Sequence, residues 1–283
     1  MLALDVGGSS VKSVVVEAGP RILSSVSVDA IQSKSSAVEI LTTLAGIIEG
    51  YLQYRREIRG VAFAFPGPFD YEQGICLIQN LDKYDALYGI DISANLRQIL
   101  GMPGLEIRYR NDAEAAILGE ARYGAGEPYS RLLGLTLGTG LGSAFLVNRE
   151  LITEGADVPE RGWLYTLPYG TQRADDVFST RGLLARLHER GLEADDIACA
   201  IQRAGEDRTA LIDSFASFGA DLGLFLEPFV SKFRADAVLI TGGIAEAWDL
   251  FAPSLIELLA VPVVKATLGR RAPSSAQRLY ICR

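Results

Sequence analysis

The sequence predicts an α/β protein built from two similar halves with a cleft between them. The chain opens at residues 2–16 with a strand, a glycine-rich turn and a second strand, and the same pattern returns at residues 132–147. Gly7 and Gly138 then stand 131 residues apart (138 − 7). At that offset three further pairs coincide: Leu2 with Leu133, Leu4 with Leu135 and Val16 with Val147. Self-similarity of this kind indicates a duplicated unit, and 283 residues are enough for two domains, each with its own core.

The bulk composition excludes several classes of protein. With 49% hydrophobic and 22% charged residues the chain is expected to fold. Its net charge of −8, without a Lys/Arg cluster, argues against a nucleic-acid partner. We expect no signal peptide, membrane span or membrane partner, because the apolar runs are interrupted by charges, glycine and proline. Three widely spaced cysteines, Cys76, Cys199 and Cys282, suit free thiols in a reducing cytoplasm rather than disulfides or a metal site.

The single histidine narrows the chemistry. His188 lies in a charged, amphipathic helical stretch, where a solvent-facing role is expected. Without a second histidine, a Ser-His-Asp triad and a histidine-rich zinc site are both disfavoured. The groups left for chemistry are carboxylates, lysines, tyrosines and backbone amides.

Each glycine-rich turn is a candidate phosphate site. In Gly7-Gly8-Ser9-Ser10 the glycines let a ligand approach the backbone, the hydroxyls and amides can hold phosphate oxygens, and Asp5 before them could hold Mg²⁺, usually through water. An ordinary hairpin would also favour Gly-Gly. A Walker loop is excluded because a strand follows and no Gly-Lys-Ser/Thr does. With Gly138-Thr139-Gly140 as the second turn, both could hold one nucleotide in the cleft.

The stretch between the two turns predicts alternating helices and strands. Residues 37–52 have the pattern of an amphipathic helix whose inward side chains are Val38, Leu41, Leu44, Ile48 and Leu52. Residues 59–65 are typical of a buried strand, which Pro66-Gly67-Pro68 ends, either as a terminator or as a ligand loop. A short strand at residues 75–78 stops at Gln79-Asn80, and a helix over residues 93–100 has Ser93 as its expected cap.

One carboxylate stands where a strand becomes a helix. Residues 105–109 alternate as a strand does, and after Asn111-Asp112 the apolar residues return at helical spacing. In an open α/β sheet, ligands bind beyond the carboxyl ends of the strands, so Asp112 is the candidate catalytic base. The alternative is structural, because Asn111 followed three residues later by Glu114 is also a capping-box pattern.

The second half continues with a polar loop and then helices. Residues 153–162 carry several charges, most of which are expected only to solvate the loop. Helices are predicted over residues 173–190, 195–204 and 208–229. A strand at residues 236–241 runs into Gly242-Gly243, where a flat base or ribose could lie against the backbone, or strand and helix could simply pack tightly.

The set of motifs resembles the ROK family of sugar kinases, within the actin-like ATPase superfamily. Five motifs carry the resemblance: the Asp5/Gly7-Gly8 hairpin, Pro66-Gly67-Pro68, Asn111-Asp112-Ala113, the Gly138-Thr139-Gly140 hairpin and Gly242-Gly243. The resemblance covers nearly the whole chain. It implies two ribonuclease-H-like (actin-like ATPase) α/β domains that close over sugar and ATP. We predict residues 1–111 as the sugar side with the first phosphate motif, and residues 112–283 as the domain of the second phosphate and adenosine motifs.

The resemblance also implies roles for single residues. The first phosphate motif is Asp5, Gly7, Gly8, Ser9 and Lys12, the second is Gly138, Thr139 and Gly140, and the adenosine motif is Gly242 and Gly243. Asn80, Asn111 and Asp112 match positions that hold sugar hydroxyls, and Asp112 also matches the catalytic base. These roles suit phosphoryl transfer, which needs in-line placement, Mg²⁺ on the phosphates and a carboxylate to accept the proton of the attacking hydroxyl.

Two departures from the family pattern concern the sugar pocket and zinc. Where the family has Gly-Glu-x-Gly-His, residues 159–163 read Pro-Glu-Arg-Gly-Trp, so Glu160 keeps the sugar-contacting place and Trp163 replaces the histidine. Asp176 aligns with a further sugar-contacting Glu. Residues 169–176 lack the cysteines with which many members bind zinc, so no zinc is expected.

The sequence therefore predicts a cytoplasmic, ATP- and Mg²⁺-dependent kinase for a hydroxyl of a hexose-like sugar, with a homodimer plausible from the family. Two alternatives are a polyphosphate-dependent kinase, since that group also lacks the zinc cysteines, and a sugar- or nucleotide-binding protein without turnover, suggested by Trp163. A helper ATPase of the actin or chaperone type is more remote. The family's repressors place a helix-turn-helix segment before the kinase-like part, and from an acidic chain that starts on the first strand we expect no such role.

Overall fold

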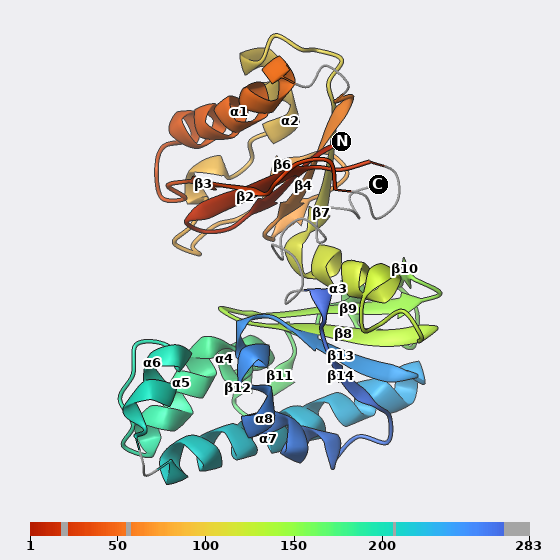
Figure 1. Cartoon of the computed structure of the whole chain (residues 1–283). Helices are drawn as coiled ribbons and strands as arrows, with labels where there is room; N and C mark the ends of the chain where they lie inside the picture. The colour runs from red at the N-terminus through yellow and green to blue at the C-terminus, as the bar shows by residue number, and fades with distance from the viewer. Residues whose placement is uncertain (18–21, 55–57, 206–207, 269–283) are drawn as a thin grey trace. The chain divides into compact units, whose positions relative to one another are not determined.

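The chain folds into two compact units. The computed structural model describes residues 1–17, 22–54, 58–205 and 208–268. Unit 1 comprises Met1–Gly119 with Leu268, and unit 2 comprises Glu120–Thr267, so the chain passes between the units once inside helix α3 (Asp112–Tyr123) and once after Thr267. Each unit has its own sheet with helices packed on it (Figure 1) and its own cluster of buried hydrophobic residues, which confirms the predicted α/β fold class.

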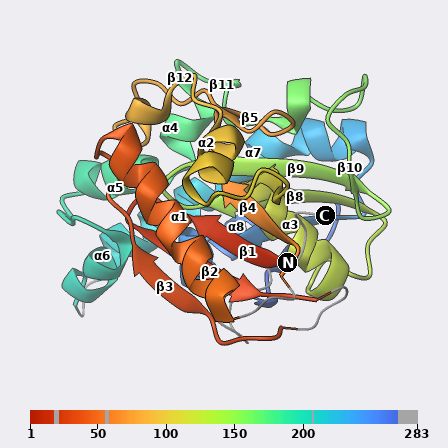
Figure 2. The ribbon, with the colours of Figure 1, turned by 90° about the horizontal axis from the view of Figure 1, so that it is seen from above.

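The sheet of unit 1 has five strands in the order β3-β2-β1-β4-β7. Their bounds in chain order are β1 Leu2–Val6, β2 Ser10–Val15, β3 Ser27–Ala30, β4 Gly60–Phe65 and β7 Glu106–Asn111. β1, β2 and β3 pair antiparallel, as the predicted hairpin requires, whereas β1, β4 and β7 pair parallel. Helices α1 (Ala37–Tyr54) and α2 (Ile92–Ile99) lie over one face of this sheet (Figure 2). The connection to α2 contains three short elements, β5 Phe69–Asp70, β6 Ile75–Cys76 and η1 Asp85–Leu87.

Unit 2 repeats this strand order as β10-β9-β8-β13-β14. Its strands are β8 Arg131–Leu137, β9 Leu141–Val147, β10 Glu150–Leu151, β13 Ala237–Thr241 and β14 Val263–Lys265. Three antiparallel strands are again followed by two parallel ones. The two hairpins differ by one residue in the turn, because Val6 pairs with Val11 but Leu137 pairs with Leu141. Equivalent residues of the two hairpins are therefore 131 positions apart on the first strand but 130 positions apart (141 − 11) on the second strand.

The remaining elements of unit 2 lie between β10 and β14. They are η2 Glu160–Gly162, β11 Pro168–Tyr169, β12 Gln172–Arg173, α4 Ala174–Val177, α5 Thr180–Glu189, α6 Ile197–Arg203, α7 Thr209–Phe233, η3 Gly243–Ala247 and α8 Trp248–Ile256. The region predicted as one helix over residues 173–190 thus contains two, separated at Ser179, whose backbone is extended (φ −115°, ψ 175°). A β-carbon at Gly182 would lie 2.3 Å from the carbonyl oxygen of Val177, so the two helices approach more closely than a larger residue allows.

Two local predictions in unit 1 are wrong. Val38 does not face inward, because 73% of it is exposed while the buried face of α1 runs through Leu41, Leu44 and Ile48. α2 is capped by Asp91, whose carboxylate accepts a hydrogen bond from the amide of Ala94 at 2.8 Å. The expected cap, Ser93, lies inside the helix and donates instead to the hydroxyl of Tyr109 at 3.0 Å.

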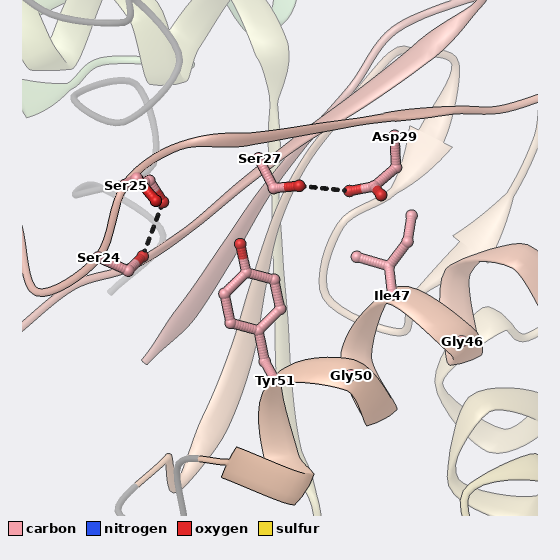
Figure 3. A pocket seen from close by; sticks show the side chains of 8 residues that line it. All are labelled: Ser24, Ser25, Ser27, Asp29, Gly46, Ile47, Gly50 and Tyr51. Carbon is pink, nitrogen blue, oxygen red and sulfur yellow. Dashed lines mark hydrogen bonds between the residues drawn. The ribbon is translucent and has the colours of Figure 1, made fainter.

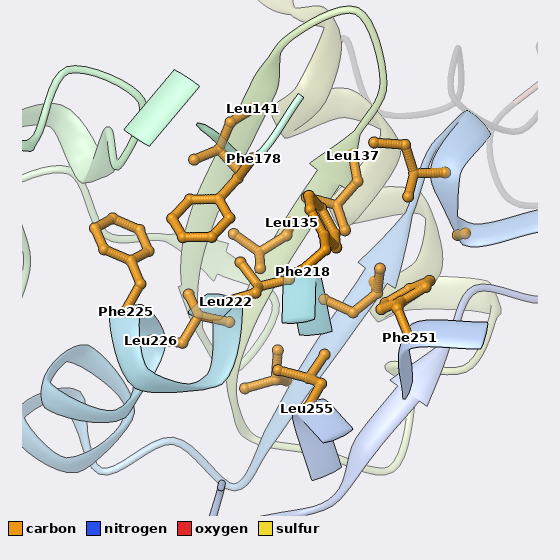
Figure 4. Packing of buried hydrophobic residues seen from close by; sticks show 14 of the residues in the cluster. Leu135, Leu137, Leu141, Phe178, Phe218, Leu222, Phe225, Leu226, Phe251 and Leu255 are labelled. Atoms are coloured by element: carbon orange, nitrogen blue, oxygen red, sulfur yellow. The ribbon is translucent and has the colours of Figure 1, made fainter. Parts of the chain in front are cut away.

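The core of unit 2 lies between its sheet and helices α7 and α8. The rings of Phe178, Phe218 and Phe251 follow one another at centroid distances of 6.0 Å and pack with leucines from β8 and α7 (Figure 4). By length and composition alone, α7 could cross a membrane, and it is the only helix in the described ranges that could. Half of its most apolar stretch is buried inside the unit, as in the core helices of globular proteins, so it is weak evidence for a membrane span.

The thiols and the histidine lie outside the motifs. Cys76 is buried and Cys199 is partly exposed, and both are free thiols, while Cys282 lies outside the described residues. His188 is 67% exposed on α5 and pairs with Glu193 at 2.7 Å. Its predicted place on the solvent-facing side of a helix is confirmed.

Candidate active site

The predicted motifs stand where parallel strands end. In unit 1, Gly7 follows β1, Pro66-Gly67-Pro68 follows β4, and Asn111-Asp112 joins β7 to α3, and these three strands are parallel neighbours. In unit 2, Gly138 follows β8 and Gly242 follows β13, which are again parallel neighbours. Carboxyl ends of parallel strands meet at one edge of a sheet, and ligands of α/β proteins bind beyond that edge. The topology therefore gathers the motifs at one edge of each sheet.

In the first glycine-rich turn most carbonyls accept hydrogen bonds from the protein, whereas two amides have no partner among the described residues. Three of its carbonyls accept hydrogen bonds: Gly7 O from the Tyr84 hydroxyl (2.5 Å), Ser9 O from Ile31 N (3.1 Å) and Ser10 O from Gly7 N (2.9 Å). The amides of Gly8 and Ser9 have no partner among the described residues, and both residues are exposed. Gly8 has no neighbour near a β-carbon and no left-handed backbone, so the fold itself does not require glycine there. Successive open amides are typical of anion-binding sites.

The second turn has the same arrangement. Its carbonyls accept hydrogen bonds as follows: Gly138 O from Thr180 N (2.7 Å) and Thr180 Oγ1 (2.9 Å), and Gly140 O from Gly138 N (3.1 Å). The amides of Thr139 and Gly140 have no partner in the part of the chain that the structure describes. Asp175 fixes the far side of the turn, where its Oδ1 accepts a hydrogen bond from the amide of Leu141 at 2.7 Å. Both turns thus present donors outward, although they differ by one residue in length.

The paired glycines after β13 have different structural reasons. Gly242 has φ 99° and ψ 177°, a region that only glycine readily adopts, and a β-carbon there would lie 2.3 Å from the carbonyl oxygen of Leu137. Gly242 therefore packs against the end of β8, next to the second turn. Gly243 begins η3, and a β-carbon on it would meet nothing within 4 Å. Tight packing, the structural alternative for this motif, explains Gly242 and does not explain Gly243.

Asn111 and Asp112 have different hydrogen-bonding roles at the start of α3. Asn111 is the helix cap, since its Oδ1 accepts hydrogen bonds from the amides of Ala113 (3.0 Å) and Glu114 (3.2 Å), and its Nδ2 donates to the hydroxyl of Tyr71 at 3.0 Å. Asp112 uses one carboxylate oxygen, Oδ1, on the amide of Ala113 at 2.9 Å. Its other oxygen has no partner within the described ranges, so the cap is Asn111 and the available carboxylate is Asp112.

Asp5, Lys12 and Asn80 complete the predicted residues of unit 1. Asp5 and Lys12 are direct cross-strand partners on β1 and β2 beside the first turn, and both are half-buried. No cluster of three or more His, Cys, Asp or Glu able to hold a metal occurs in the described ranges. One carboxylate with waters and substrate phosphates is a usual set for Mg²⁺, and Asp5 beside an anion-type turn fits that set. Asn80 is exposed and has a left-handed backbone, with φ 59°.

The residues of unit 2 in the predicted sugar pocket differ in their exposure and in their contacts. Glu160 is exposed at the start of η2. Trp163 is half-buried, and the guanidinium of Arg161 lies 5.1 Å from the centre of its ring. Asp176 is 44% exposed and already forms an ion pair with Arg181 at 2.7 Å. Any role of Asp176 toward a sugar would compete with this ion pair.

Sequence reasoning missed three residues that support the turns. Tyr84, Asp175 and Thr180 hold the glycine-rich turns through contacts over 34 to 77 positions of sequence. Asp175 stands next to the predicted Asp176, and a pair of acids at a helix start was the one visible signal. The other two have no local pattern that would single them out.

A groove of about 390 Å³ lies elsewhere in unit 1, between α1 and β3 with the segment that leads into β3 (Figure 3). Its lining residues are Ser24, Ser25, Ser27, Asp29, Gly46, Ile47, Gly50 and Tyr51. Ser27 donates to the carboxylate of Asp29 at 3.2 Å. None of the predicted site residues lines this groove.

Solved structures define the class of the fold. The crystal structure of a ROK family glucokinase from Streptomyces griseus in complex with glucose and AMPPNP matches with a TM-score of 0.74 and 21% identity, covering 99% of this chain and 97% of that one. The inorganic polyphosphate/ATP-glucomannokinase from Arthrobacter sp. strain KM matches with a TM-score of 0.70 and 23% identity, over 99% and 96% of the two chains. The fold is that of the actin-like ATPase sugar kinases.

The chain belongs to the ROK family, whose model matches residues 1–272. The glucokinase of Thermotoga maritima is 24% identical over 95% of this chain and 90% of its own length. The xylose repressor of Bacillus subtilis is 22% identical over 69% of this chain and 51% of its own length. Relatives of this chain thus include a kinase and a repressor.

Proposed function

We propose that this protein is a cytoplasmic sugar kinase that transfers the terminal phosphoryl group of ATP to a hydroxyl of a hexose-like sugar. The observation that carries the proposal is the pair of glycine-rich turns, each with most of its carbonyls bound by the protein and with two successive amides that have no partner among the described residues. Open successive amides of this kind suit the oxygens of phosphate groups. Relatives named glucokinase, and a structural neighbour solved with glucose and AMPPNP, support the same reaction.

In the proposed mechanism Asp112 is the general base. Its unengaged carboxylate oxygen would accept the proton of the attacking sugar hydroxyl. Asn111 is held by its cap bonds and by Tyr71, which leaves one N–H of its amide group for a neighbouring hydroxyl. Asn80 and Glu160 would bind further hydroxyls. Asp176 is a weaker candidate because Arg181 already binds it.

The nucleotide would be held by backbone more than by side chains. The amides of the two turns would bind phosphate oxygens, with Lys12 and Ser9 adding side-chain donors to the first turn. When bound, Mg²⁺ spreads the negative charge of the phosphates, and Asp5 is the residue that would hold it, through water. Gly243, where a side chain would meet only open space, would let the adenosine approach the backbone.

Particular residues weigh against the rival functions. A protein that only binds sugar or nucleotide needs no base, whereas Asp112 stands at the strand-to-helix junction with one oxygen available. A polyphosphate donor has no adenosine, so it would give no reason for the glycine at position 243, which the fold does not require. ATP is therefore the favoured donor. A homodimer remains an expectation from the family.

The experiment is coupled ADP release with Mg-ATP over hexoses, aminosugars and N-acetylhexosamines, with polyphosphate as an alternative donor. Wild type is compared with Asp112→Asn and with Asp213→Asn, a matched control on an exposed residue of α7. We expect sugar-dependent turnover that Asp112→Asn lowers about 10²–10⁴-fold and the control leaves unchanged. No turnover with any sugar, although ATP raises the melting temperature, would favour the binding-protein alternative. Turnover that survives in Asp112→Asn would show that another group is the base.

A further inference from the structure

Tyr84 connects the first glycine-rich turn to the segment that carries Asn80. Its side chain is fully buried, and its ring packs against Phe65 with the centroids 5.3 Å apart. Its hydroxyl donates to the carbonyl oxygen of Gly7 at 2.5 Å, across 77 positions of sequence. Among the described residues, the Gly7 carbonyl is the one polar partner of the Tyr84 hydroxyl, so this buried phenol acts on the turn predicted to bind phosphate.

The backbone around Tyr84 is held in an unusual conformation. Tyr84 has φ 57° and ψ 12°, a left-handed conformation that is sterically unfavourable for an aromatic residue. Its amide donates to the carbonyl of Ser33 at 2.7 Å, and its carbonyl accepts from the amide of Leu87 at 2.9 Å. Asn80 and Asp82 are left-handed as well. Such conformations persist where surrounding contacts fix them, so the position of the Tyr84 hydroxyl is well defined.

The hydrogen bond from Tyr84 sets the orientation of the peptide between Gly7 and Gly8. A trans peptide is planar, and its carbonyl and N–H point in opposite directions. Because the Gly7 carbonyl points at the buried Tyr84 hydroxyl, the Gly8 N–H points away from it. Gly8 is an exposed residue, and its N–H has no partner among the residues described. Glycine on both sides would otherwise let this peptide rotate freely.

The hydroxyl of Tyr84 is a permanent donor. Burial raises the pKa of the Tyr84 phenol well above its ordinary value, and the nearby thiol of Cys76 raises it further. The group is therefore protonated throughout the range in which the protein would work. The hydrogen bond to the Gly7 carbonyl therefore does not depend on pH in that range.

We propose that Tyr84 is a positioning residue that directs the Gly8 amide outward as a donor to nucleotide phosphate. The inference rests on the proposed function, because it takes the first turn to be a phosphate site. Tyr84 is too deeply buried to contact a ligand and acts only through Gly7. Affinity for ligands with phosphate groups should therefore depend on the Tyr84 hydroxyl, and affinity for adenosine should not.

The test is calorimetric binding of ATP, ADP and adenosine, with Mg²⁺, to wild type, Tyr84→Phe and Tyr109→Phe. Tyr84→Phe keeps the ring against Phe65 and removes only the hydroxyl. Tyr109→Phe is the matched control, because Tyr109 is also buried in unit 1 and, within the described ranges, its hydroxyl accepts a hydrogen bond from Ser93 alone, at 3.0 Å. We expect Tyr84→Phe to bind ATP and ADP about tenfold more weakly, in line with a lost hydrogen bond to a charged group. Adenosine should bind equally to all three proteins.

Each other outcome overturns a specific statement. If both variants bind ATP like wild type, Tyr84 is not a positioning residue, while the proposed function stands. If Tyr84→Phe loses ATP and adenosine equally, the hydroxyl supports the fold in general and not the phosphate donor. If wild type binds no ATP, the proposed function fails, and the inference fails with it. Melting temperatures of the two variants, expected to be similar, show whether either one has lost its fold.

Discussion

Alanine substitutions at Gly242 and Gly243, the paired glycines after β13, can distinguish a structural role from a ligand-binding role. An alanine β-carbon at position 242 would lie 2.3 Å from the carbonyl oxygen and 2.7 Å from the amide nitrogen of Leu137, on a backbone with φ 99°. The backbone conformation costs an L residue about 1–3 kcal/mol, and the collision adds about 1–3 kcal/mol. We therefore expect Gly242→Ala to lower the free energy of unfolding by about 4 kcal/mol.

Gly243→Ala should behave in the opposite way. Its β-carbon meets nothing within 4 Å, and its backbone is not left-handed, so the free energy of unfolding should change by less than about 0.5 kcal/mol. If adenosine lies against this backbone, the added methyl should weaken ATP binding about tenfold or more.

Urea unfolding and ATP titration of both variants and wild type make the comparison. In a domain of 150–250 residues, a loss of about 4 kcal/mol corresponds to a fall in melting temperature of roughly 8–16 °C. Gly242→Ala with wild-type stability would refute the packing argument. Gly243→Ala with wild-type affinity for ATP would remove Gly243 from the nucleotide site.

Glu114→Gln should raise the melting temperature at about pH 8, and the increase should be much smaller at about pH 4.5. Burial raises the pKa of the Glu114 carboxyl, so the stability that its protonated form contributes at low pH is lost as the pH rises through the folded-state pKa. An equal gain at both pH values would contradict this. Asp175→Ala removes the acceptor for the amide of Leu141 and should raise the KM for ATP several-fold with a stability loss of about 1–2 kcal/mol, which steady-state kinetics and urea unfolding would measure. Gly219→Ala should destabilise by about 1–3 kcal/mol in urea unfolding, because a β-carbon on α7 would lie 2.1 Å from the carbonyl oxygen of Phe251 on α8; a variant with wild-type stability would show that the two helices can move apart.

The sequence predicted best what local pattern determines. Alternating apolar residues on either side of a glycine-rich turn located both hairpins, and the repeat of that pattern predicted two units with one topology. The sequence did not show that the two turns differ by one residue in length. Gly7 and Gly138 mark where each turn begins, but they do not show where the second strand of each hairpin starts to pair. Register depends on which backbone groups bond across the hairpin, as in the pairing of Val6 with Val11.

The errors occurred where one residue or one turn of helix decides the answer. Val38 has helical spacing to apolar neighbours, but it lies in the first turn of α1, where the side chain leaves the buried face. Ser93 is a good capping residue, but Asp91 is another and stands where the helix begins. Periodicity predicts that a helix exists more reliably than it predicts the helix ends.

The supports of the candidate site could not have been predicted from sequence. Tyr84 and Thr180 act on glycine carbonyls 77 and 42 positions away, and their neighbours in sequence give no sign of it. Asn111 shows a related difficulty, since the capping-box pattern and the predicted sugar contact fall on the same side chain. The structure assigns its oxygen to the cap, and its sugar contact stays a prediction.

The ends of the two sheets bear on how this protein behaves in concentrated solution. β3, β10 and β14 lie at sheet ends and have only four, two and three residues. β7, the longer end strand, carries Glu106, Arg108 and Arg110 at alternate positions, with Glu106 and Arg108 in an ion pair at 2.5 Å. Short or charged strands at a sheet end resist pairing with strands of another molecule. The short or charged strands at the ends of both sheets therefore make edge-to-edge pairing between molecules unfavourable.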